Sequence, residues 1–404
     1  MEKTLKPSLR FKGFTDTWEQ YKLRDISIYK NGTSNEGGQS SLGKYELINL
    51  NSIDIEGGLK SSNKFIDYAS ETLQKNDIVM VLSDVAHGYL LGRVALIPED
   101  NRYVLNQRVA LLRINIEANP SYIARNINAN QLYFKNLGAG SSQLNISKST
   151  VENYMVGFPT IVEQVKIASL FDSLDNLITL HQRKYDKLVN VKKALLDKMF
   201  PKNGELVPRL RFKGFTEAWE QCKLTDEVTL FGGLTYSPNN IVKENGTLVL
   251  RSSNVKDGEI IDADNVFVSH DVVNVDNVKN GDIIVVVRNG SRSLIGKHAQ
   301  IKKNSENTVI GAFMSGLRSD QPQFINALLD TPLFKKEIDK NLGATINQIT
   351  NGMFHQMFFL MPDNTEKSLI GKTFNYIDKL ITLHQRKYEK LVNMKKALLQ
   401  KMFV

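Results

Sequence analysis

The sequence DNLITLHQRKYDKLVNVKKALLDKMF, residues 175–200, returns near the C-terminus as DKLITLHQRKYEKLVNMKKALLQKMF, residues 378–403. The two stretches are identical at 22 of 26 aligned positions. A second block, residues 9–23, returns as residues 210–224 with 12 of 15 positions identical. The long inserts between these blocks hardly match each other. The chain therefore predicts two copies of one architecture, with constant ends and variable middles.

Each repeated stretch lies within a longer row of residues spaced alternately by four and three, the 3.5-residue period of a coiled coil. At 1.5 Å per residue each helix would be about 50 Å long. Pro201 and the Asn203-Gly204 pair end the first helix. The predicted seam consists of Ile167, Phe171, Leu174, Ile178, His181, Tyr185, Leu188 and Leu195, and of Ile370, Phe374, Ile377, Ile381, His384, Tyr388, Leu391 and Leu398, with Lys192, Met199, Lys395 and Met402 at the remaining positions.

We expect the two seams to pair in antiparallel fashion within one chain and to give the chain pseudo-twofold symmetry. In this register His181 lies opposite Tyr388, and Tyr185 lies opposite His384. Lys192 then lies beside Ile377 and Lys395 beside Leu174, and each lysine is expected to extend its ammonium outward to water. Pairing between chains, or packing of each helix on its own domain, stays open as an alternative.

A capping box is expected where each long helix begins. In the first copy Thr160 follows Pro159, and Glu163 is expected to reach back to the cap amide. In the second copy Asp363 and Glu366 occupy the same places.

Both inserts show short apolar runs separated by turn residues, followed by one helical stretch. Strands are expected at residues 45–50, 77–82, 91–97 and 108–114, and in the second insert at 247–251, 282–288, 296–301 and 313–317. Helices are expected at 120–136 and 324–341. The predicted fold class is α+β: two similar, mixed, strand-rich domains joined by two long helices that form an antiparallel coiled coil. The expected domains are residues 1–159, helix 160–204, residues 205–362 and helix 363–404.

Composition narrows the classes of protein. The 404 residues carry a net charge of +9, which favours acidic polymers such as DNA as partners but also fits a basic enzyme. No apolar run reaches the roughly 20 residues of a membrane span, and the N-terminus lacks the apolar core of a signal peptide. The single cysteine, Cys222, fits a reducing cytoplasm.

No catalytic or metal-binding constellation stands out. The six histidines occur singly, and Cys222 has no partner, so a zinc site is not expected. Residues 38–44 have the spacing of a phosphate-binding loop, but Tyr45 replaces the Ser or Thr that would hold magnesium. We expect no catalytic residue, no metal and no cofactor on this chain.

Polar, amide-rich and basic loops recur at corresponding places in the two inserts. Arginine can read guanine, Asn and Gln can read adenine, and Ser can hold phosphate, so these loops are candidate DNA-binding surfaces of different specificity. The candidates are Asn49, Asn51, Ser83, His87, Tyr89, Arg93, Gln107, Arg108, Ser142, Gln143 and Asn145 in the first insert, and Arg251, Ser253, Asn254, Arg288, Asn289, Ser291, Arg292, Lys297, His298, Asn347 and Gln348 in the second.

Several motifs resemble the specificity subunit of type I restriction-modification systems. Residues 158–164 (FPTIVEQ), followed by Ile167-Ala168 and Leu174-Asp175, are similar to the segment with which that family begins its spacer helix. Residues 251–254 and 288–292 are similar to parts of its target-recognition domains. The second copy departs from the pattern at Lys367, where the family has glutamine.

The resemblance implies a multisubunit complex. Each recognition domain would read one half of a bipartite, asymmetric site in double-stranded DNA, and the paired helices would fix the spacer. Two methyltransferase subunits would dock on the helices, with two restriction-translocase subunits as further partners. S-adenosylmethionine, ATP and magnesium would then bind to those partners. Two alternatives stay open: a self-contained restriction or modification enzyme, and a coiled-coil protein adaptor that binds no DNA.

Overall fold

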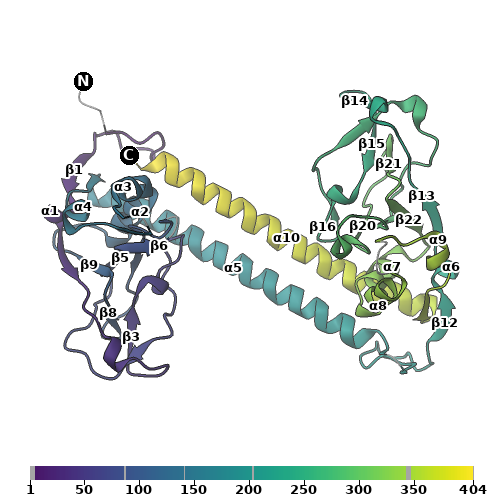
Figure 1. Ribbon diagram of the computed structural model, residues 1–404, viewed down its shortest axis with the longest axis horizontal. Coiled ribbons are helices and arrows are strands. Elements are labelled where there is room, and N and C mark those ends of the chain that lie inside the picture. The colour runs from purple at the N-terminus through teal and green to yellow at the C-terminus, as the bar shows by residue number, and fades with distance from the viewer. Residues whose placement is uncertain (1–4, 86–87, 141, 203, 343–346, 404) are drawn as a thin grey trace. The chain divides into compact units, whose positions relative to one another are not determined.

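The computed structural model describes residues 5–85, 88–140, 142–202, 204–342 and 347–403 (Figure 1). The chain divides into two compact units. Unit 1 comprises the chain up to Leu180 together with the part from Lys387 onward, and unit 2 comprises His181 to Arg386. Each unit thus contains one insert and segments of both long helices. The part of a unit outside the long helices is called domain 1 or domain 2.

Domain 1 combines short strands with short helices. Its strands are β1 (Glu19–Lys22), β2 (Ser27–Asn31), β3 (Tyr45–Ile48), β4 (Phe65–Ile66), β5 (Ile78–Val81), β6 (Ser83–Val85), β7 (Val94–Leu96), β8 (Tyr103–Leu105), β9 (Val109–Ile114), β10 (Gln143–Asn145) and β11 (Met155–Phe158). Its helices are α1 (Leu23–Ile26), η1 (Glu36–Gly38), η2 (Leu50–Ser52), α2 (Pro120–Ala129), α3 (Gln131–Leu137) and α4 (Lys148–Glu152). The main antiparallel sheet has the order β2-β9-β5-β7, and a second sheet has the order β4-β3-β8. Two-stranded ladders join β1 to β11 and β6 to β10.

Domain 2 repeats this plan with different lengths. Its strands are β12 (Glu220–Lys223), β13 (Thr229–Gly232), β14 (Ile241–Val242), β15 (Thr247–Leu250), β16 (Val255–Lys256), β17 (Glu259–Ile260), β18 (Val266–Val268), β19 (Ile283–Val286), β20 (His298–Gln300), β21 (Thr308–Ile310), β22 (Met314–Arg318) and β23 (Phe358–Met361). Its helices are α6 (Leu224–Glu227), η3 (Pro238–Asn240), η4 (Ser252–Asn254), η5 (His270–Val272), η6 (Arg292–Leu294), α7 (Pro322–Leu329), α8 (Pro332–Asn341) and α9 (Asn351–Phe354). The sheets have the orders β13-β22-β19-β20 and β14-β18-β15-β21, with ladders β12-β23 and β16-β17.

The predicted strands are present, with ends shifted by up to three residues, whereas each predicted helix is two helices. In domain 2 the break is at Thr331, whose hydroxyl accepts the Phe334 amide while Pro332 starts α8. Proline suits the first turn of a helix but prevents the preceding residue from continuing one. In domain 1 the break is at Asn130, whose backbone φ of −110° is not helical. The expectation of one continuous helix was therefore wrong in both domains.

The long helices are α5 (Ile161–Met199) and α10 (Asn364–Met402). They pair in antiparallel fashion in each unit: Phe171 lies beside Phe403 and Asp175 beside Lys395 in unit 1, while His181 bonds His384 in unit 2. Every predicted seam residue is buried or half-buried, as the 3.5-residue period requires. Within the described ranges, no helix is long and apolar enough to cross a membrane.

The polar seam residues behave differently from expectation. Lys192 and Lys395 do not extend to water: each Nζ lies 2.6 Å from an aspartate of the other long helix. The predicted neighbours were Ile377 for Lys192 and Leu174 for Lys395. The observed partners, Asp378 and Asp175, are the next residues in the sequence, which agrees with the predicted register. The Nδ1 atoms of His181 and His384 lie 2.8 Å apart, a contact that the prediction lacked.

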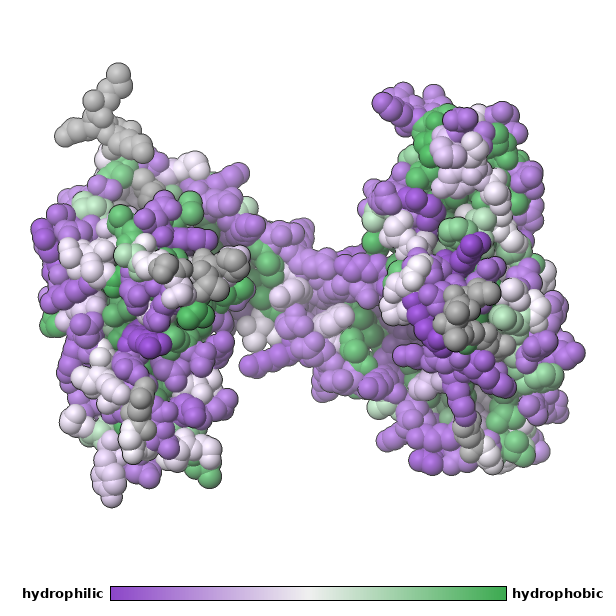
Figure 2. All heavy atoms as spheres, viewed as in Figure 1, coloured by the Kyte–Doolittle hydropathy of each residue, from purple (hydrophilic) through white to green (hydrophobic). Residues whose placement is uncertain are grey.

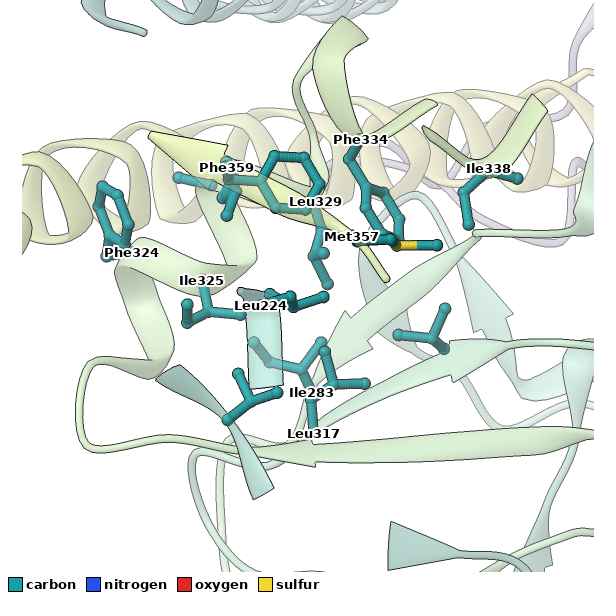
Figure 3. Packing of buried hydrophobic residues seen from close by; sticks show 14 of the residues in the cluster. Leu224, Ile283, Leu317, Phe324, Ile325, Leu329, Phe334, Ile338, Met357 and Phe359 are labelled. Carbon is teal, nitrogen blue, oxygen red and sulfur yellow. The ribbon is translucent and has the colours of Figure 1, made fainter. Parts of the chain in front are cut away.

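Each unit closes its core over the end of a long helix. In unit 1, Phe403 at the end of α10 stacks on Tyr122 with ring centroids 5.5 Å apart. In unit 2, Phe200 at the end of α5 stacks on Phe324 at 5.7 Å. Figure 3 shows how Phe324 and its neighbours from α7, α8 and β23 face Leu224 of α6 and Ile283 and Leu317 of the sheet. The repeated C-terminal segments are thus core elements.

A buried ion pair joins the repeated block that opens each half of the chain, residues 9–23 or 210–224, to the start of the long helix of the same half. Glu163, 1% exposed, accepts from Arg10 Nε at 2.8 Å and Nη2 at 2.7 Å, and from Trp18 Nε1 at 3.2 Å. Glu366 binds Arg211 and Trp219 in the same way. The predicted capping box is therefore wrong for the glutamates, although the cap residues do bind the helix amides. We call each Arg–Glu–Trp set a clamp.

Candidate nucleic-acid interface

In unit 1 four loops meet at the carboxyl end of β5. The Val81 amide donates to the Arg93 carbonyl and the Leu82 amide to the Arg108 carbonyl, both at 2.9 Å. The Ile146 amide donates to the Leu82 carbonyl, also at 2.9 Å. Beyond this point β6 pairs with β10. These bonds bring together residues 83–85, 92–93, 106–108 and 143–146, which are distant in the sequence.

Several polar and aromatic side chains are exposed around this point. Tyr89 is 64% exposed, and the Lys135 ammonium lies 5.2 Å from its ring centroid. Arg108 is exposed and has a φ of 67°, a conformation that residues with a Cβ rarely adopt. Ser142, just before β10, and Asn145, within the β6–β10 ladder, are exposed, and Gln143 donates to Ser83 in that ladder. Strained backbone of this kind gathers at functional loops.

The same meeting of loops occurs at the carboxyl end of β19 in unit 2. The Gly296 amide donates to the Val286 carbonyl at 2.9 Å, and the Ile349 amide donates to the Val287 carbonyl at 2.8 Å. Arg288 forms a β-bridge with Gln348, in the place of the β6–β10 ladder. The equivalent point in each domain is thus surrounded by loops whose polar side chains differ between the two domains.

The exposed side chains of unit 2 are more basic. The Arg288 guanidinium lies 4.9 Å from the ring centroid of Phe313, and both side chains are exposed. Arg292 and Lys297 are exposed nearby in the sequence, and Ser291 bonds Ser293. Because no carboxylate pairs with Arg288 among the described residues, its guanidinium is available to an acidic partner.

Amide side chains tie these loops to one another. Asn289 Nδ2 donates to Ser252 Oγ at 3.0 Å, which brings the residue 251–254 loop to the same point. Asn347 Nδ2 donates to the Gly290 carbonyl at 3.3 Å. In unit 1 the contact is made by the backbone instead: the Asn106 backbone N–H donates to the Ile48 carbonyl at 2.9 Å, which places the residue 49–51 loop beside residues 106–108.

Three predicted DNA contacts lie in the interior, and burial corrects these predictions. Ser83 is 3% exposed. Asn254 is fully buried, and its Nδ2 donates to Asn265 Oδ1 at 2.9 Å and to the Ala263 carbonyl at 2.8 Å. His298 is 9% exposed and its Nε2 lies 3.4 Å from Asp330. Burial would lower the pKa of His298, but its hydrogen bond with Asp330 and the charge of Asp330 raise it.

The other predicted residues vary in exposure. Arg93 is half-buried with a pKa lowered by burial, and its Nη1 donates to the Asn128 carbonyl. Arg251 is half-buried and pairs with Asp264 at 2.7 Å. Asn49, Gln107, Asn289, Asn347 and Gln348 are half-buried, Asn51 and Ser253 are exposed, and His87 lies outside the described residues.

Two exposed residues of this interface escaped the sequence analysis. Phe313 was not among the predicted DNA-binding residues because it stands at the start of a predicted strand, where an apolar residue is ordinary. Lys135 was not among them because it lies in the predicted helix 120–136, outside the polar loops. The recurring pairing of a cation with an exposed aromatic, Lys135 with Tyr89 and Arg288 with Phe313, could be found only in the folded chain.

Among the described residues, no group of three or more His, Cys, Asp or Glu side chains is arranged to hold a metal ion.

Comparison with known proteins connects this geometry to a family. The family model "Type I restriction modification DNA specificity domain" matches residues 15–190. The MjaVIII specificity subunit of a type I restriction enzyme from Methanocaldococcus jannaschii is 23% identical over 355 residues, which cover 84% of this chain and 81% of that protein. Residues 15–190 therefore match the DNA specificity domain of type I restriction-modification systems, and the chain is similar to a specificity subunit of such a system over most of its length. The resemblance found in the sequence is confirmed.

Two further likenesses are consistent with this assignment. The EcoKI specificity subunit from Escherichia coli K12 is 25% identical over 183 residues, 43% of this chain and 39% of that protein. The crystal structure of the specificity subunit from M. genitalium matches 98% of this chain and 99% of its own, with a TM-score of 0.65 and 16% identity. That structure supports the predicted fold class of mixed domains with two long helices.

Proposed function

We propose that this specificity subunit reads a bipartite, asymmetric site in double-stranded DNA, one half with each domain. The observation that carries the proposal is the meeting of variable loops at the carboxyl ends of β5 and β19. Equivalent points on two related domains present different polar side chains. This is the arrangement expected if two similar domains read two different base sequences.

The exposed groups have the chemistry of base and phosphate contacts. Arg288 can donate two hydrogen bonds to the O6 and N7 atoms of guanine in the major groove. Gln143 and Asn145 can pair with adenine in the same way. Lys297, a point charge on a flexible stem, is suited to phosphate. The net charge of +9 would attract the duplex.

We further propose that the paired helices fix the spacer between the half-sites. Each has 39 residues, which corresponds to about 58 Å at 1.5 Å per residue. Inserting one heptad into both helices should lengthen the recognised spacer and leave the bases of both half-sites unchanged. An unchanged spacer in the methylation pattern of such a variant would contradict this role.

The outer faces of the helices are the proposed docking surface for two methyltransferase subunits, and through them for restriction subunits. These faces carry exposed cations that recur in both copies, and Figure 2 shows that the visible helix surface is largely hydrophilic. The cations are Arg183, Lys184, Lys187 and Lys193, with the copies Arg386, Lys387, Lys390 and Lys396. S-adenosylmethionine, ATP and magnesium would act on the partner subunits, and this chain would contribute recognition without catalysis.

Binding to labelled DNA tests the proposal. The complex co-expressed with its methyltransferase subunit should bind a duplex containing the site with an affinity that falls steeply as salt rises. Negligible affinity at low salt would favour a protein adaptor instead. Cleavage or methylation of DNA by the purified chain alone, supplied with S-adenosylmethionine, ATP and magnesium, would favour a self-contained enzyme.

A further inference from the structure

The two long helices make the same ion pair in each unit. In unit 1, Lys395 Nζ lies 2.6 Å from an Asp175 carboxylate oxygen. In unit 2, Lys192 Nζ lies 2.6 Å from an Asp378 carboxylate oxygen. The internal repeat makes the two lysines counterparts, and likewise the two aspartates. We call this lysine–aspartate pair the helix dyad.

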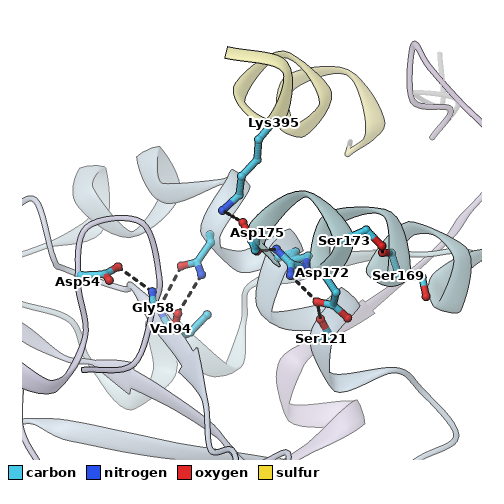
Figure 4. A network of polar contacts seen from close by, with 11 residues as sticks. Asp54, Gly58, Val94, Ser121, Ser169, Asp172, Ser173, Asp175 and Lys395 are labelled. Carbon is cyan, nitrogen blue, oxygen red and sulfur yellow. Dashed lines mark hydrogen bonds and ion pairs between the residues drawn. The ribbon is translucent and has the colours of Figure 1, made fainter. Parts of the chain in front are cut away.

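Domain 1 engages the aspartate of its helix dyad. Arg125 on α2 donates from Nη1 to Asp175 at 2.9 Å and from Nη2 to Asp172 at 2.5 Å. Its guanidinium lies 5.4 Å from the ring centroid of Phe171, and only 16% of the side chain is exposed. Figure 4 shows Lys395 of α10 reaching Asp175, and Ser121 bonded to Asp172. A chain of opposite charges thus runs from domain 1 through α5 to α10.

Domain 2 engages the lysine of its helix dyad instead. Asp330, directly after α7, accepts from Lys192 at 2.6 Å and also faces His298. Burial would raise the pKa of Asp330, but the hydrogen bond and charge of His298, followed by Lys192, lower it to about 2. A second carboxylate of domain 2, Glu259, accepts from Thr382 of α10 at 3.0 Å. Domain 2 therefore presents acids where domain 1 presents a base.

The sequence differences on the two sides of this contact match. Counted from the prolines that start α2 and α7, the counterpart of Arg125 is Ala327. The counterpart of Asp172 is Asn375, so the helix lacks its second acid where the domain lacks its arginine. Conversely, the counterpart of Asp330 is Asn128, which bonds the Val94 backbone at 2.9 and 3.1 Å. Charges on the domain and on the helix have changed together.

We propose that Arg125 and Asp330 are positioning residues, each holding its domain in one orientation on the long helices by binding the opposite member of the same dyad. Neither residue belongs to the loops of the candidate interface. Two ion pairs that share one aspartate or one lysine restrain a domain more than apolar packing alone, because charged hydrogen bonds are directional. The consequence for DNA rests on the proposed function: a loosened domain would present its loops at a range of positions along the duplex.

The orientation can be measured in the full chain without DNA. Starting from Cys222→Ser, spin labels are placed on exposed positions of unit 2 by Lys279→Cys and Lys379→Cys. Pulsed electron spin resonance then gives the distribution of distances between domain 2 and α10. We expect Asp330→Asn to broaden it, and Asp330→Glu, which keeps the carboxylate, to restore a narrow one.

Unit 1 supplies the matched control. Labels at Lys75→Cys and Asn176→Cys should be unaffected by Asp330→Asn and should respond to Arg125→Met. An exposed ion pair elsewhere, removed by Asp197→Asn, should broaden neither distribution. The positioning role would be overturned if neither Arg125→Met nor Asp330→Asn changed the width of the distance distribution in either unit. It would also be overturned if either variant broadened the distributions of both units equally, or if Asp330→Glu gave a broad distribution.

DNA binding by the co-expressed complex extends the test to function. Asp330→Asn should reduce the preference for the correct spacer over spacers one base pair longer or shorter by about tenfold, equivalent to about 1.4 kcal/mol. The base preferences within both half-sites should stay the same, which a general loss of stability would not achieve. If the unaltered complex recognises no bipartite site, the proposed function fails, and the label distances still decide the positioning role.

Discussion

The clamp of unit 1 permits a quantitative prediction, because Glu163→Gln removes one buried charge and leaves the shape of the side chain. Glu163 is 1% exposed and accepts three hydrogen bonds, two of them from Arg10. Its carboxylate also raises the pKa of Arg10, chiefly through the hydrogen bond. Removing one partner of a buried pair costs about 3–5 kcal/mol. Arg10 keeps its bond to the Asp16 carbonyl, so we expect the lower end, about 3 kcal/mol.

The two tryptophans make the assay specific to each unit. Trp18 lies in the clamp of unit 1 and Trp219 in that of unit 2. With Trp219→Phe as background, Trp18 fluorescence reports urea unfolding of unit 1. The free energy of unfolding falls by about 3 kcal/mol per molar urea, so a loss of about 3 kcal/mol lowers the urea midpoint by about 1 M.

Controls separate the clamp from general effects. Glu152→Gln removes a surface pair with Lys148, whose side chains are 27% and 57% exposed, and should shift the midpoint by less than about 0.3 M. In the reciprocal Trp18→Phe background, Trp219 should report an unchanged midpoint for Glu163→Gln. A shift as small as that of the exposed control would refute the clamp as a major source of stability. Equal shifts at both tryptophans would refute its confinement to one unit.

Further predictions concern the interface and its surroundings. Arg288→Ala should cost about 1–3 kcal/mol of discrimination at one base position, measured by competition between oligonucleotides, whereas Lys297→Ala should weaken all sequences alike and lower the salt slope by about one. His298, whose pKa is raised in the folded state, should stabilise unit 2 below about pH 6.5 and lose this contribution as pH rises through its folded pKa. His298→Gln should therefore weaken the pH dependence of the urea unfolding midpoint that Trp219 reports between pH 6 and 9. A midpoint with the same pH dependence as the unaltered protein would contradict this assignment.

Much of the framework could be predicted from the sequence. The internal repeat predicted two related units, and the 3.5-residue period predicted the buried seam from Ile167 to Leu195 and from Ile370 to Leu398. These signals are strong because they are periodic and local, and each apolar position has one place to pack. The family resemblance was carried by short motifs at the start of α5 and in the variable loops.

The remaining features depend on contacts between distant residues. Glu163 was expected to bind its own cap amide, which is local, but Arg10 offers two charged hydrogen bonds from 153 residues away. Lys192 was expected to reach water, but Asp330 of domain 2 covers it. His298 read as a polar loop residue because its buried partner, Asp330, lies elsewhere in the fold. In each case a long-range partner decided whether a polar residue faces solvent.

Exchange of one variable insert tests the central claim most directly. The second insert is replaced by that of a related specificity subunit, the chain is co-expressed with its methyltransferase, and the methylated positions in plasmid DNA are mapped. We predict that one half-site changes while the other half-site and the spacer stay the same. A change in both half-sites, or methylation that ignores the exchange, would contradict independent reading by the two domains.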